Sequence, residues 1–246
     1  MKNNMAYQET KLIRLRKNQQ EKTTDMVIRE SELNISFNGE KIFTLNYSNG
    51  GEEYLGVGFL FTEGFLKKKE EISYLKYIQE KETIEVVTKN INSTQKREKR
   101  AELSLKIKED KIKIKADVIF QLLDDCQSRA KLFLLTGCTH SCALANREGS
   151  ILLFTEDVSR YNTVDKILGE ALLQELPLED KIMIGSFRVT SGIFTKILRG
   201  RIPLIISRSA PTNRVIELAQ KMGITLIGFA REERMNIYTY PECIDT

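Results

Sequence analysis

From Asp117 onward, short apolar segments alternate with amphipathic ones, and this alternation constrains the fold more than any other feature of the sequence. Apolar residues in 119–126 recur at i, i+3, i+4 and i+7, the spacing of one helix face. Further helices are expected at 164–172, 190–198 and 215–222, between strands at 132–135, 151–154, 182–184, 202–206, 224–229 and 236–240. Strands that are apolar throughout must be covered on both faces. We therefore expect a three-layer α/β domain.

The first part of the chain follows a different pattern, that of strands and hairpins. Apolar and polar residues alternate over 33–47, and Asn38-Gly39 in the middle is a strong hairpin signal. The apolar segment 52–63 predicts a buried helix. Its inner glycines, Gly56 and Gly58, weaken the helix propensity and therefore indicate close packing.

A change of composition divides the chain. A strand is expected near 84–87 and an alternating hairpin over 103–114, and the stretch 88–102 between them is almost wholly polar. We interpret that stretch as a solvated linker. The sequence thus predicts a smaller β-rich α+β domain over residues 1–115 and the three-layer domain over 116–246.

Composition excludes several classes of protein. No apolar run approaches the roughly 18 residues of a membrane span, and the polar first 24 residues lack the apolar core of a signal peptide, so we expect a cytoplasmic location. Four cysteines are too few for a disulfide framework, and a net charge of +4 is small for a nucleic-acid-binding protein. Ten of the fifteen arginines follow residue 115. Because the planar guanidinium suits bidentate contact with phosphate, a small phosphorylated ligand is expected there.

Most of the reactive side chains lie in loops after the expected strands, where ligands of open α/β sheets collect. These loops are TGCTHSC (136–142), EDVSRYN (156–162), SFR (186–188), SRSAPT (207–212) and REER (231–234). The loop 207–212 precedes a helix, whose N-terminus offers unpaired N–H groups to an anion. An ordinary capped turn is the alternative for this loop. The arginines of three other loops, Arg160, Arg188 and Arg231, favour the phosphate interpretation.

The loop 136–142 holds the single histidine of the chain, His140, between Cys138 and Cys142. Cys-x-His-x-Cys spacing could hold zinc, but no second Cys/His pair supplies further ligands. A structural histidine and a ligand-contacting one are the alternatives. The two cysteines are expected near a helix start, where a thiolate is stabilised, although either could be structural. Cys126, on an apolar helix face, is expected in the core.

Taken in order, these loops resemble the FdhD/NarQ family of formate dehydrogenase accessory proteins. The matching segments are TGCTHSCAL (136–144), EDVSRYNTVDKILG (156–169), SFRVTSGIFTK (186–196), SRSAPT (207–212) and GITLIGFAREERMNIYT (223–239). ESELNISFNGE (30–40) and LGVGFLFTEGF (55–65) are similar to the N-terminal half of the family. The resemblance covers most of the chain, from about residue 28 to the end.

The resemblance implies a cytoplasmic sulfur carrier that serves formate dehydrogenase. Such a protein takes persulfide sulfur from a cysteine desulfurase and passes it to a molybdenum or tungsten cofactor, bis-molybdopterin guanine dinucleotide. The resemblance also implies a cytidine-deaminase-like C-terminal domain with a guanine-nucleotide site, a homodimer, and neither nucleic acid, membrane nor intrinsic metal. Carried over residue by residue, the binding candidates are His140, Arg160, Asn162, Asp165, Lys166, Arg188, Ser207, Ser209, Phe229, Ala230, Arg231, Glu232, Glu233 and Arg234.

The sequence departs from the family where the sulfur chemistry takes place. The Cys-x-x-Cys pair that the family carries between its two halves has no counterpart here, since no cysteine precedes Cys126. The zinc signature of deaminases is also absent, which argues against deamination. Persulfide chemistry would therefore use Cys138 or Cys142 as the catalytic residue. The alternatives are a nucleotide- or cofactor-binding module without sulfurtransferase activity, and a metalloenzyme that uses Cys138, His140 and Cys142.

Overall fold

A six-stranded mixed sheet forms the centre of the second part of the chain, in the order β13-β12-β11-β10-β8-β9. The computed structural model describes residues 6–89 and 112–245. The six strands are β8 (His140–Ala145), β9 (Ile151–Asp157), β10 (Ile182–Gly185), β11 (Leu204–Ser207), β12 (Thr225–Arg231) and β13 (Arg234–Thr239). The central strands β10, β11 and β12 run parallel, while β8, β9 and β13 pair antiparallel with their neighbours. The carboxyl ends of the parallel strands therefore share one edge of the sheet.

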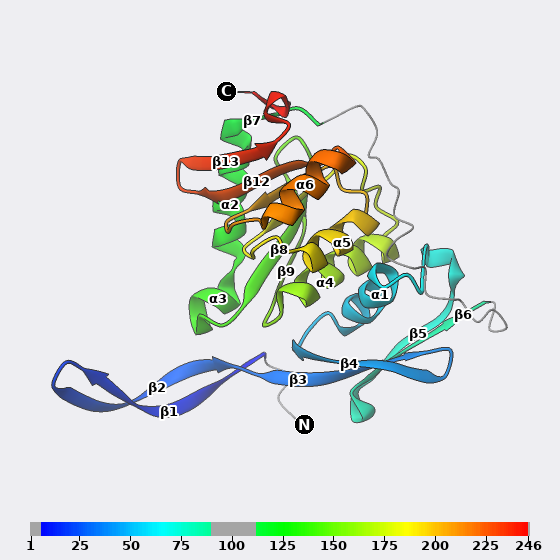
Figure 1. The fold of residues 1–246 in the computed structure, drawn as a ribbon. Helices are drawn as coiled ribbons and strands as arrows, with labels where there is room; N and C mark the ends of the chain where they lie inside the picture. The colour runs from blue at the N-terminus through cyan, green and yellow to red at the C-terminus, as the bar shows by residue number, and fades with distance from the viewer. Residues whose placement is uncertain (1–5, 90–111, 246) are drawn as a thin grey trace.

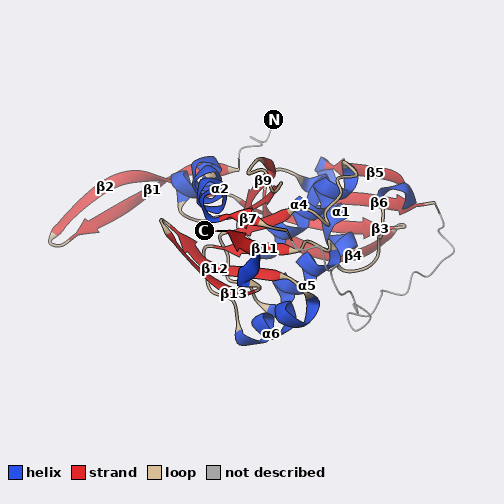
Figure 2. Ribbon diagram, turned by 90° about the horizontal axis from the view of Figure 1, so that it is seen from above, coloured by secondary structure: helices blue, strands red, loops and turns tan. Residues whose placement is uncertain are grey.

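Helices cover both faces of this sheet (Figures 1 and 2). One face carries α4 (Arg160–Leu173), α5 (Ser191–Arg199) and α6 (Asn213–Met222), and the other carries α2 (Ala116–Arg129). Along β8, Leu144 packs into the cluster under α4 and α5, while Ala143 packs into the cluster under α2 with the predicted core residue Cys126. The predicted three-layer α/β arrangement is confirmed.

The first part of the chain forms a smaller sheet with one helix on it, as predicted. The sheet has the order β4-β3-β6-β5 and consists of β3 (Glu30–Phe37), β4 (Glu40–Ser48), β5 (Ile72–Ile78) and β6 (Thr83–Thr88). Both turn residues between β3 and β4, Asn38 and Gly39, have positive φ, as a tight hairpin requires. The helix α1 (Glu52–Thr62) packs on the sheet through a buried apolar cluster. The 3₁₀ turns η1 (Lys69–Glu71) and η2 (Gln79–Lys81) flank β5.

Helix α1 joins the two parts of the molecule by packing against α4, as the neighbouring ribbons in Figure 1 show. The contact is backbone against backbone, because a Cβ atom on Gly58 would lie 1.7 Å from the carbonyl oxygen of Asp165. A Cβ atom on Gly169 of α4 would lie 2.0 Å from the carbonyl oxygen of Tyr54. The close packing predicted from the glycines of α1 is therefore confirmed.

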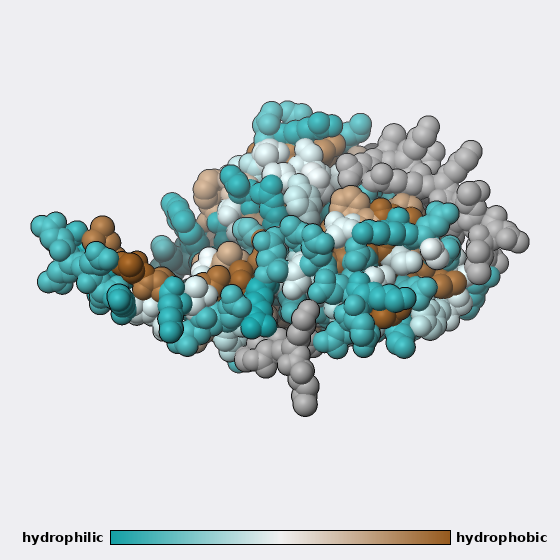
Figure 3. Space-filling model, turned by 90° about the horizontal axis from the view of Figure 1, so that it is seen from below, coloured by the Kyte–Doolittle hydropathy of each residue, from teal (hydrophilic) through white to brown (hydrophobic). Residues whose placement is uncertain are grey.

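A long two-stranded arm precedes these elements and was not predicted. Strands β1 (Tyr7–Arg16) and β2 (Gln19–Ile28) pair over their whole length and project from the body (Figures 1 and 2). Apolar side chains lie exposed among hydrophilic ones along the arm (Figure 3), with Ile13 at 59% and Leu15 at 71% exposure. The helix α3 (Lys131–Thr136) lies against β2.

The strand predicted at 132–135 is wrong, because these residues form α3. Its first turn is held from a distant strand, since the carboxylate of Glu156 accepts the N–H groups of Leu132 (2.8 Å) and Phe133 (2.7 Å). Gly137, with φ of 67°, ends the helix. Four apolar residues are too few to show the periodicity of either a helix or a strand. The hydrogen bonds from Glu156, which a local sequence pattern does not contain, favour the helix.

The other sequence predictions have mixed outcomes. The loop predicted around the second cysteine is wrong from His140 onward, since β8 begins there. Most of the polar linker and of the hairpin predicted after it fall on residues 90–111, outside the described residues. The short strand β7 (Ile114–Lys115) pairs with β14 (Ile244–Asp245), which follows the 3₁₀ turn η4 (Pro241–Cys243). The domain boundary near residue 115 stays a prediction.

Candidate functional site

The carboxyl edge of the central strands brings distant loops side by side. His140 begins β8 opposite Asp157, the last residue of β9. Ser186 follows β10, and its backbone N–H donates to the carbonyl of Ser141 (3.1 Å). The loop after β11 joins them, since the Ser209 hydroxyl donates to the carbonyl of Ser186 (3.0 Å). Four segments separated in the sequence therefore meet at one place.

Two arginines bring positive charge to this edge. Arg160 is the first residue of α4, and Arg188 lies exposed in the loop after β10. Burial lowers the pKa of His140, and the positive charges of Arg160 and Arg188 lower it further, against the opposing charge of Asp157. The positive charges of both arginines therefore act on the same imidazole. The predicted candidates His140, Arg160 and Arg188 are thus brought together.

A cleft opens next to this edge, between β4 and α1 on one side and the first turns of α4 and α5 on the other. Its volume is about 570 Å³, within the range of small-molecule sites. Phe43 and Tyr161 line it, and the Arg160 guanidinium lies over the Tyr161 ring at 5.4 Å. Deeper in the cleft lie Asp165 and Lys196. The cleft therefore extends from Tyr161, which Arg160 covers, to Asp165 and Lys196 at the junction of the two parts of the molecule.

The serines predicted to bind an anion after β11 instead bond to neighbouring loops. The buried Ser207 hydroxyl donates to the carbonyl of Phe187 (2.5 Å) and accepts the N–H of Ser209 (3.0 Å). Arg208 acts on the pKa of Cys126, which places its charge toward the α2 side of the sheet. In this loop the serines hold the edge in shape, while the positive charge near His140 comes from other loops.

Three further candidates, Asn162, Asp165 and Lys166, lie buried on α4. The Asn162 amide donates to the carbonyl of Asn46 (2.8 Å) and to the carboxylate of Asp157 (2.9 Å). The ammonium of Lys166 lies 2.7 Å from the carboxylate of Asp157 and donates to the backbone carbonyl of Ser48. These groups reach across to β4. Asn162 and Lys166 thus join the small sheet to α4.

Asp165 makes the corresponding link to α1 and α5. Its carboxylate oxygens each lie 2.9 Å from the ammonium of Lys196, and the Thr62 hydroxyl donates to it at 2.6 Å. Burial raises the pKa of Asp165, while Lys196 and Thr62 act in the opposite direction. The spacing of the polar residues contained a signal for this role, because 162, 165, 166 and 169 occupy one helix face that ends in the glycine packed on α1.

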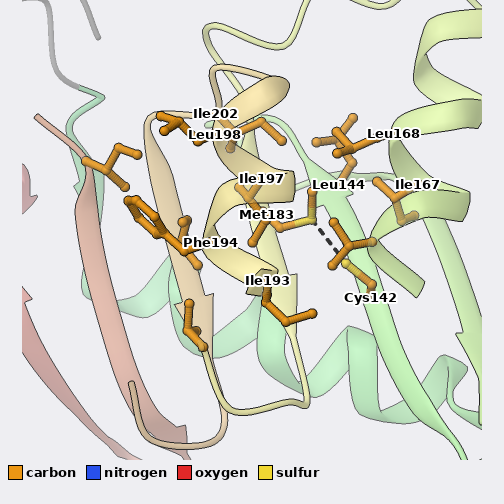
Figure 4. Packing of buried hydrophobic residues seen from close by; sticks show 14 of the residues in the cluster. Cys142, Leu144, Ile167, Leu168, Met183, Ile193, Phe194, Ile197, Leu198 and Ile202 are labelled. Carbon is orange, nitrogen blue, oxygen red and sulfur yellow. Dashed lines mark hydrogen bonds between the residues drawn. The ribbon is translucent and has the colours of Figure 1, made fainter. Parts of the chain in front are cut away.

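The two cysteines of the 136–142 segment lie in opposite environments. Cys142 is fully buried on β8, and its thiol donates to the sulfur of Met183 at 3.1 Å among apolar side chains (Figure 4). Burial raises the pKa of Cys142 far above its ordinary value. Cys138 is exposed in the turn after α3. Of this pair, only Cys138 offers an accessible sulfur atom.

Residues 28–245 match the model of the FdhD/NarQ family. The chain belongs to this family. The protein named sulfur carrier protein FdhD from Saccharolobus solfataricus is 34% identical over 248 residues, which cover 95% of this chain and 96% of that protein. Protein FdhD from Methanocaldococcus jannaschii is also 34% identical, over 87% of this chain and 88% of its own length. A crystal structure of a formate dehydrogenase accessory protein from Desulfotalea psychrophila has a TM-score of 0.86 and 28% identity, and covers 98% of this chain and all of that one.

The last segment of the FdhD/NarQ candidates, 229–234, is split between the edge and a turn. The N–H of Phe229 donates to the carbonyl of Ser209 (3.1 Å), so Phe229 adjoins the edge. Ala230 is buried, and the exposed residues of the turn are Arg231, Glu232, Glu233 and Arg234. Ser186 was predicted only as part of the loop 186–188 and was not among the binding candidates. Its signal was its place directly after a buried strand and two residues before Arg188.

Two properties of the described residues of this FdhD/NarQ chain bear on other functions. In 6–89 and 112–245, no group of three or more His, Cys, Asp or Glu side chains is arranged to hold a metal ion. Within the same ranges, no helix is both long and apolar enough to span a membrane.

Proposed function

We propose that this FdhD/NarQ protein binds the guanine-dinucleotide molybdenum or tungsten cofactor of formate dehydrogenase and supports its sulfuration. The observation that carries the proposal is the meeting of four loops at the carboxyl edge of the sheet, where the segments that bear Arg160 and Arg188 lie beside His140. The names of the relatives, sulfur carrier protein and formate dehydrogenase accessory protein, supply the sulfur transfer and the client. The cofactor is what the resemblance to the family implies.

The chemistry of the edge suits the pyrophosphate of a guanine dinucleotide. Two guanidinium groups can each make paired hydrogen bonds to phosphate oxygens. The first turns of α4 and α5 border the neighbouring cleft, and helix N-termini attract negative charge. The cleft volume, about 570 Å³, leaves room for part of the nucleotide. We therefore assign phosphate recognition to Arg160 and Arg188.

For the sulfur step we assign Cys138, the exposed cysteine, and not the buried Cys142. The Cys138 thiolate would attack the outer sulfur of the persulfide on a cysteine desulfurase. The S–S bond of the donor breaks, the donor cysteine leaves as a thiolate, and Cys138 keeps the transferred sulfur as a persulfide, without net oxidation or reduction. Attack by a thiolate needs an accessible sulfur atom, and Cys142 is fully buried.

One observation favours a second candidate function. Of the two cysteines in residues 138–142, only one is exposed, whereas a sulfur relay between two cysteines would need both to be accessible. A cofactor-binding module without sulfur transfer would keep the arginine edge and need no reactive cysteine. The two predictions below separate these functions.

Alanine at Arg188 is expected to weaken the binding of guanosine diphosphate about 10- to 100-fold, because one charged contact to phosphate is lost. Calorimetry of the whole protein measures this. Arg147→Ala is the control, since Arg147 is exposed in the turn at the far end of β8 and should leave the affinity unchanged. Absence of binding to the unaltered protein, or equal affinity in Arg188→Ala, would contradict the nucleotide site.

Labelled sulfur from a cysteine desulfurase is expected on Cys138 alone. Cys138→Ala should abolish the label, and Cys142→Ala should retain it, because the Cys142 sulfur is enclosed by apolar side chains. Mass spectrometry of peptides after incubation with labelled cysteine locates the persulfide. A protein that binds the nucleotide but takes no label would be the binding module, and a label on Cys142 would overturn the assignment to Cys138.

A further inference from the structure

We propose that Ser186 positions His140 with its proton on Nε2, so that the neutral imidazole donates a hydrogen bond to a phosphate oxygen of the bound ligand. The inference rests on the proposed phosphate site and adds a residue and a protonation form to it. It begins from a short chain of contacts that joins β8 to the loop after β10.

The first step concerns the hydroxyl of Ser186. Its oxygen accepts the backbone N–H of Ser141 at 3.0 Å and lies 3.4 Å from Nδ1 of His140. A serine hydroxyl has one proton to donate. The oxygen could accept a second hydrogen bond, but among the described residues Nδ1 is the one acceptor within reach of the hydroxyl proton, so donation to Nδ1 is the arrangement that gives this proton a partner. A lone pair on Nδ1 leaves the imidazole proton on Nε2.

The second step concerns the charge of the ring. Burial and the two arginines lower the pKa of His140, and Asp157 on the neighbouring strand opposes them. The imidazole is therefore neutral at neutral pH, and its two nitrogens have different roles. A charged imidazolium would donate from both nitrogens, and Ser186 would then have no influence on what the outer nitrogen binds.

The third step concerns Nε2 itself. Nδ1 faces Ser186, and across the part of the chain that the structure describes no residue hydrogen-bonds to Nε2 of the half-buried ring. The charges of Arg160 and Arg188 reach the same imidazole. A ligand oxygen that accepts hydrogen bonds from these guanidinium groups can then also accept one from Nε2–H.

The proton position decides which ligand atom His140 can recognise. With the proton on Nε2, the ring donates to an oxyanion such as a phosphate oxygen. With the proton on Nδ1, the ring offers a lone pair, which would match a nucleobase N–H and leave a phosphate oxygen facing another lone pair. Ser186 thereby selects phosphate over base at this position.

Nitrogen NMR of the free protein tests the proton position, since His140 is the single histidine of the chain and gives one unambiguous signal pair. Protonated Nε2 and unprotonated Nδ1 are expected at neutral pH. In Ser186→Ala a mixture of both forms is expected, and Ser186→Thr should restore the single form. Ser150→Ala, in the turn at the far end of the β8–β9 hairpin, is the control. Protonated Nδ1 in the unaltered protein, or the same spectrum in Ser186→Ala, would overturn the inference.

A second measurement uses inorganic pyrophosphate as the ligand. Ser186→Ala should weaken its binding about tenfold, the effect of one mispaired hydrogen bond, while Ser150→Ala should not. Unchanged pyrophosphate affinity in Ser186→Ala would overturn the role of the proton in recognition. Because the NMR spectrum needs no ligand, the inference on Ser186 and the proposed nucleotide function can fail separately.

Discussion

Alanine at Gly58 is expected to lower the free energy of unfolding by at least about 3 kcal/mol, because α1 and α4 would have to move apart. The added Cβ would lie 1.7 Å from the carbonyl oxygen of Asp165 and 3.0 Å from the backbone nitrogen of Gly169. Backbone atoms inside a helix cannot turn aside as a side chain can. The better helix propensity of alanine, about 1 kcal/mol, is too small to offset the clash.

Urea unfolding of the whole protein measures the loss of stability. Gly56→Ala on the same helix provides a milder substitution for comparison. A Cβ on Gly56 would meet side-chain atoms of Ile84 at 2.5 Å, and a side chain can shift, so a smaller loss of about 1–3 kcal/mol is expected. Glu53→Ala, on the exposed side of α1, should change stability by less than about 0.5 kcal/mol. Equal stability of Gly58→Ala and Glu53→Ala would contradict the backbone contact.

Local signals in the sequence predict much of the fold, and the two glycines of α1 are one example. Short apolar runs predict the central strands, because strands buried on both faces are almost wholly apolar, as IMIG in β10 and LIIS in β11 are. Local signals of this kind, such as the Asn38-Gly39 turn, act within a few residues. They therefore locate β3, β4, α1, β6, α2 and the strands and helices from β9 to β13.

Two elements, α3 and the arm, escape prediction from local signals. The helix α3 depends on Glu156, which lies more than twenty residues away on β9. The arm β1–β2 is a regular pairing of largely polar strands, which have little apolar alternation to reveal them. For α3 the stabilising contact is absent from the local window that a sequence pattern samples, whereas for the arm the partner strand is adjacent in sequence and the apolar alternation is missing.

The residues of the candidate site are likewise predicted only in part. Several segments that resemble the FdhD/NarQ family lie at the carboxyl edge of the sheet. The resemblance, however, treats all polar residues of a segment alike. Within α4, Arg160 reaches the edge while Asp165, five residues on, is buried against α1 and α5. Burial separates the two roles, and likewise separates Cys138 from Cys142. On α4 the shared helix face of 162, 165, 166 and 169 contained a signal of burial, whereas residue type and spacing hold none that separates the two cysteines.

Methionine at Lys196 is expected to cost about 3–5 kcal/mol, because it leaves the carboxylate of Asp165 buried without its cation. In the folded protein the Lys196 ammonium contacts both oxygens of Asp165 at 2.9 Å, donates to the Thr62 hydroxyl at 2.8 Å, and lies 3.5 Å from Glu63. The side chains of Lys196 and Asp165 are 9% and 1% exposed, so solvent screens the pair little. Chemical denaturation measures the loss.

The loss should depend on pH, with a sign fixed by Asp165. Burial already raises the pKa of this carboxyl above 3.8, and removing the Lys196 charge raises it further. A carboxyl whose pKa is higher in the folded than in the unfolded state favours the folded state less as pH rises above the unfolded value. The deficit of Lys196→Met relative to the unaltered protein should therefore be small near pH 4 and largest near pH 7. A deficit independent of pH would place the cost in packing instead.

A double variant separates the charge from the packing. Asp165→Leu together with Lys196→Met replaces the ion pair by two apolar side chains and should recover most of the stability lost in Lys196→Met alone. The Thr62 hydroxyl keeps an acceptor in the double variant, because it also lies 3.3 Å from the carbonyl of Phe59. If guanosine diphosphate still binds to the double variant, Asp165 serves the junction of α1, α4 and α5 and not the ligand. Loss of binding in a stably folded double variant would return Asp165 to the binding site.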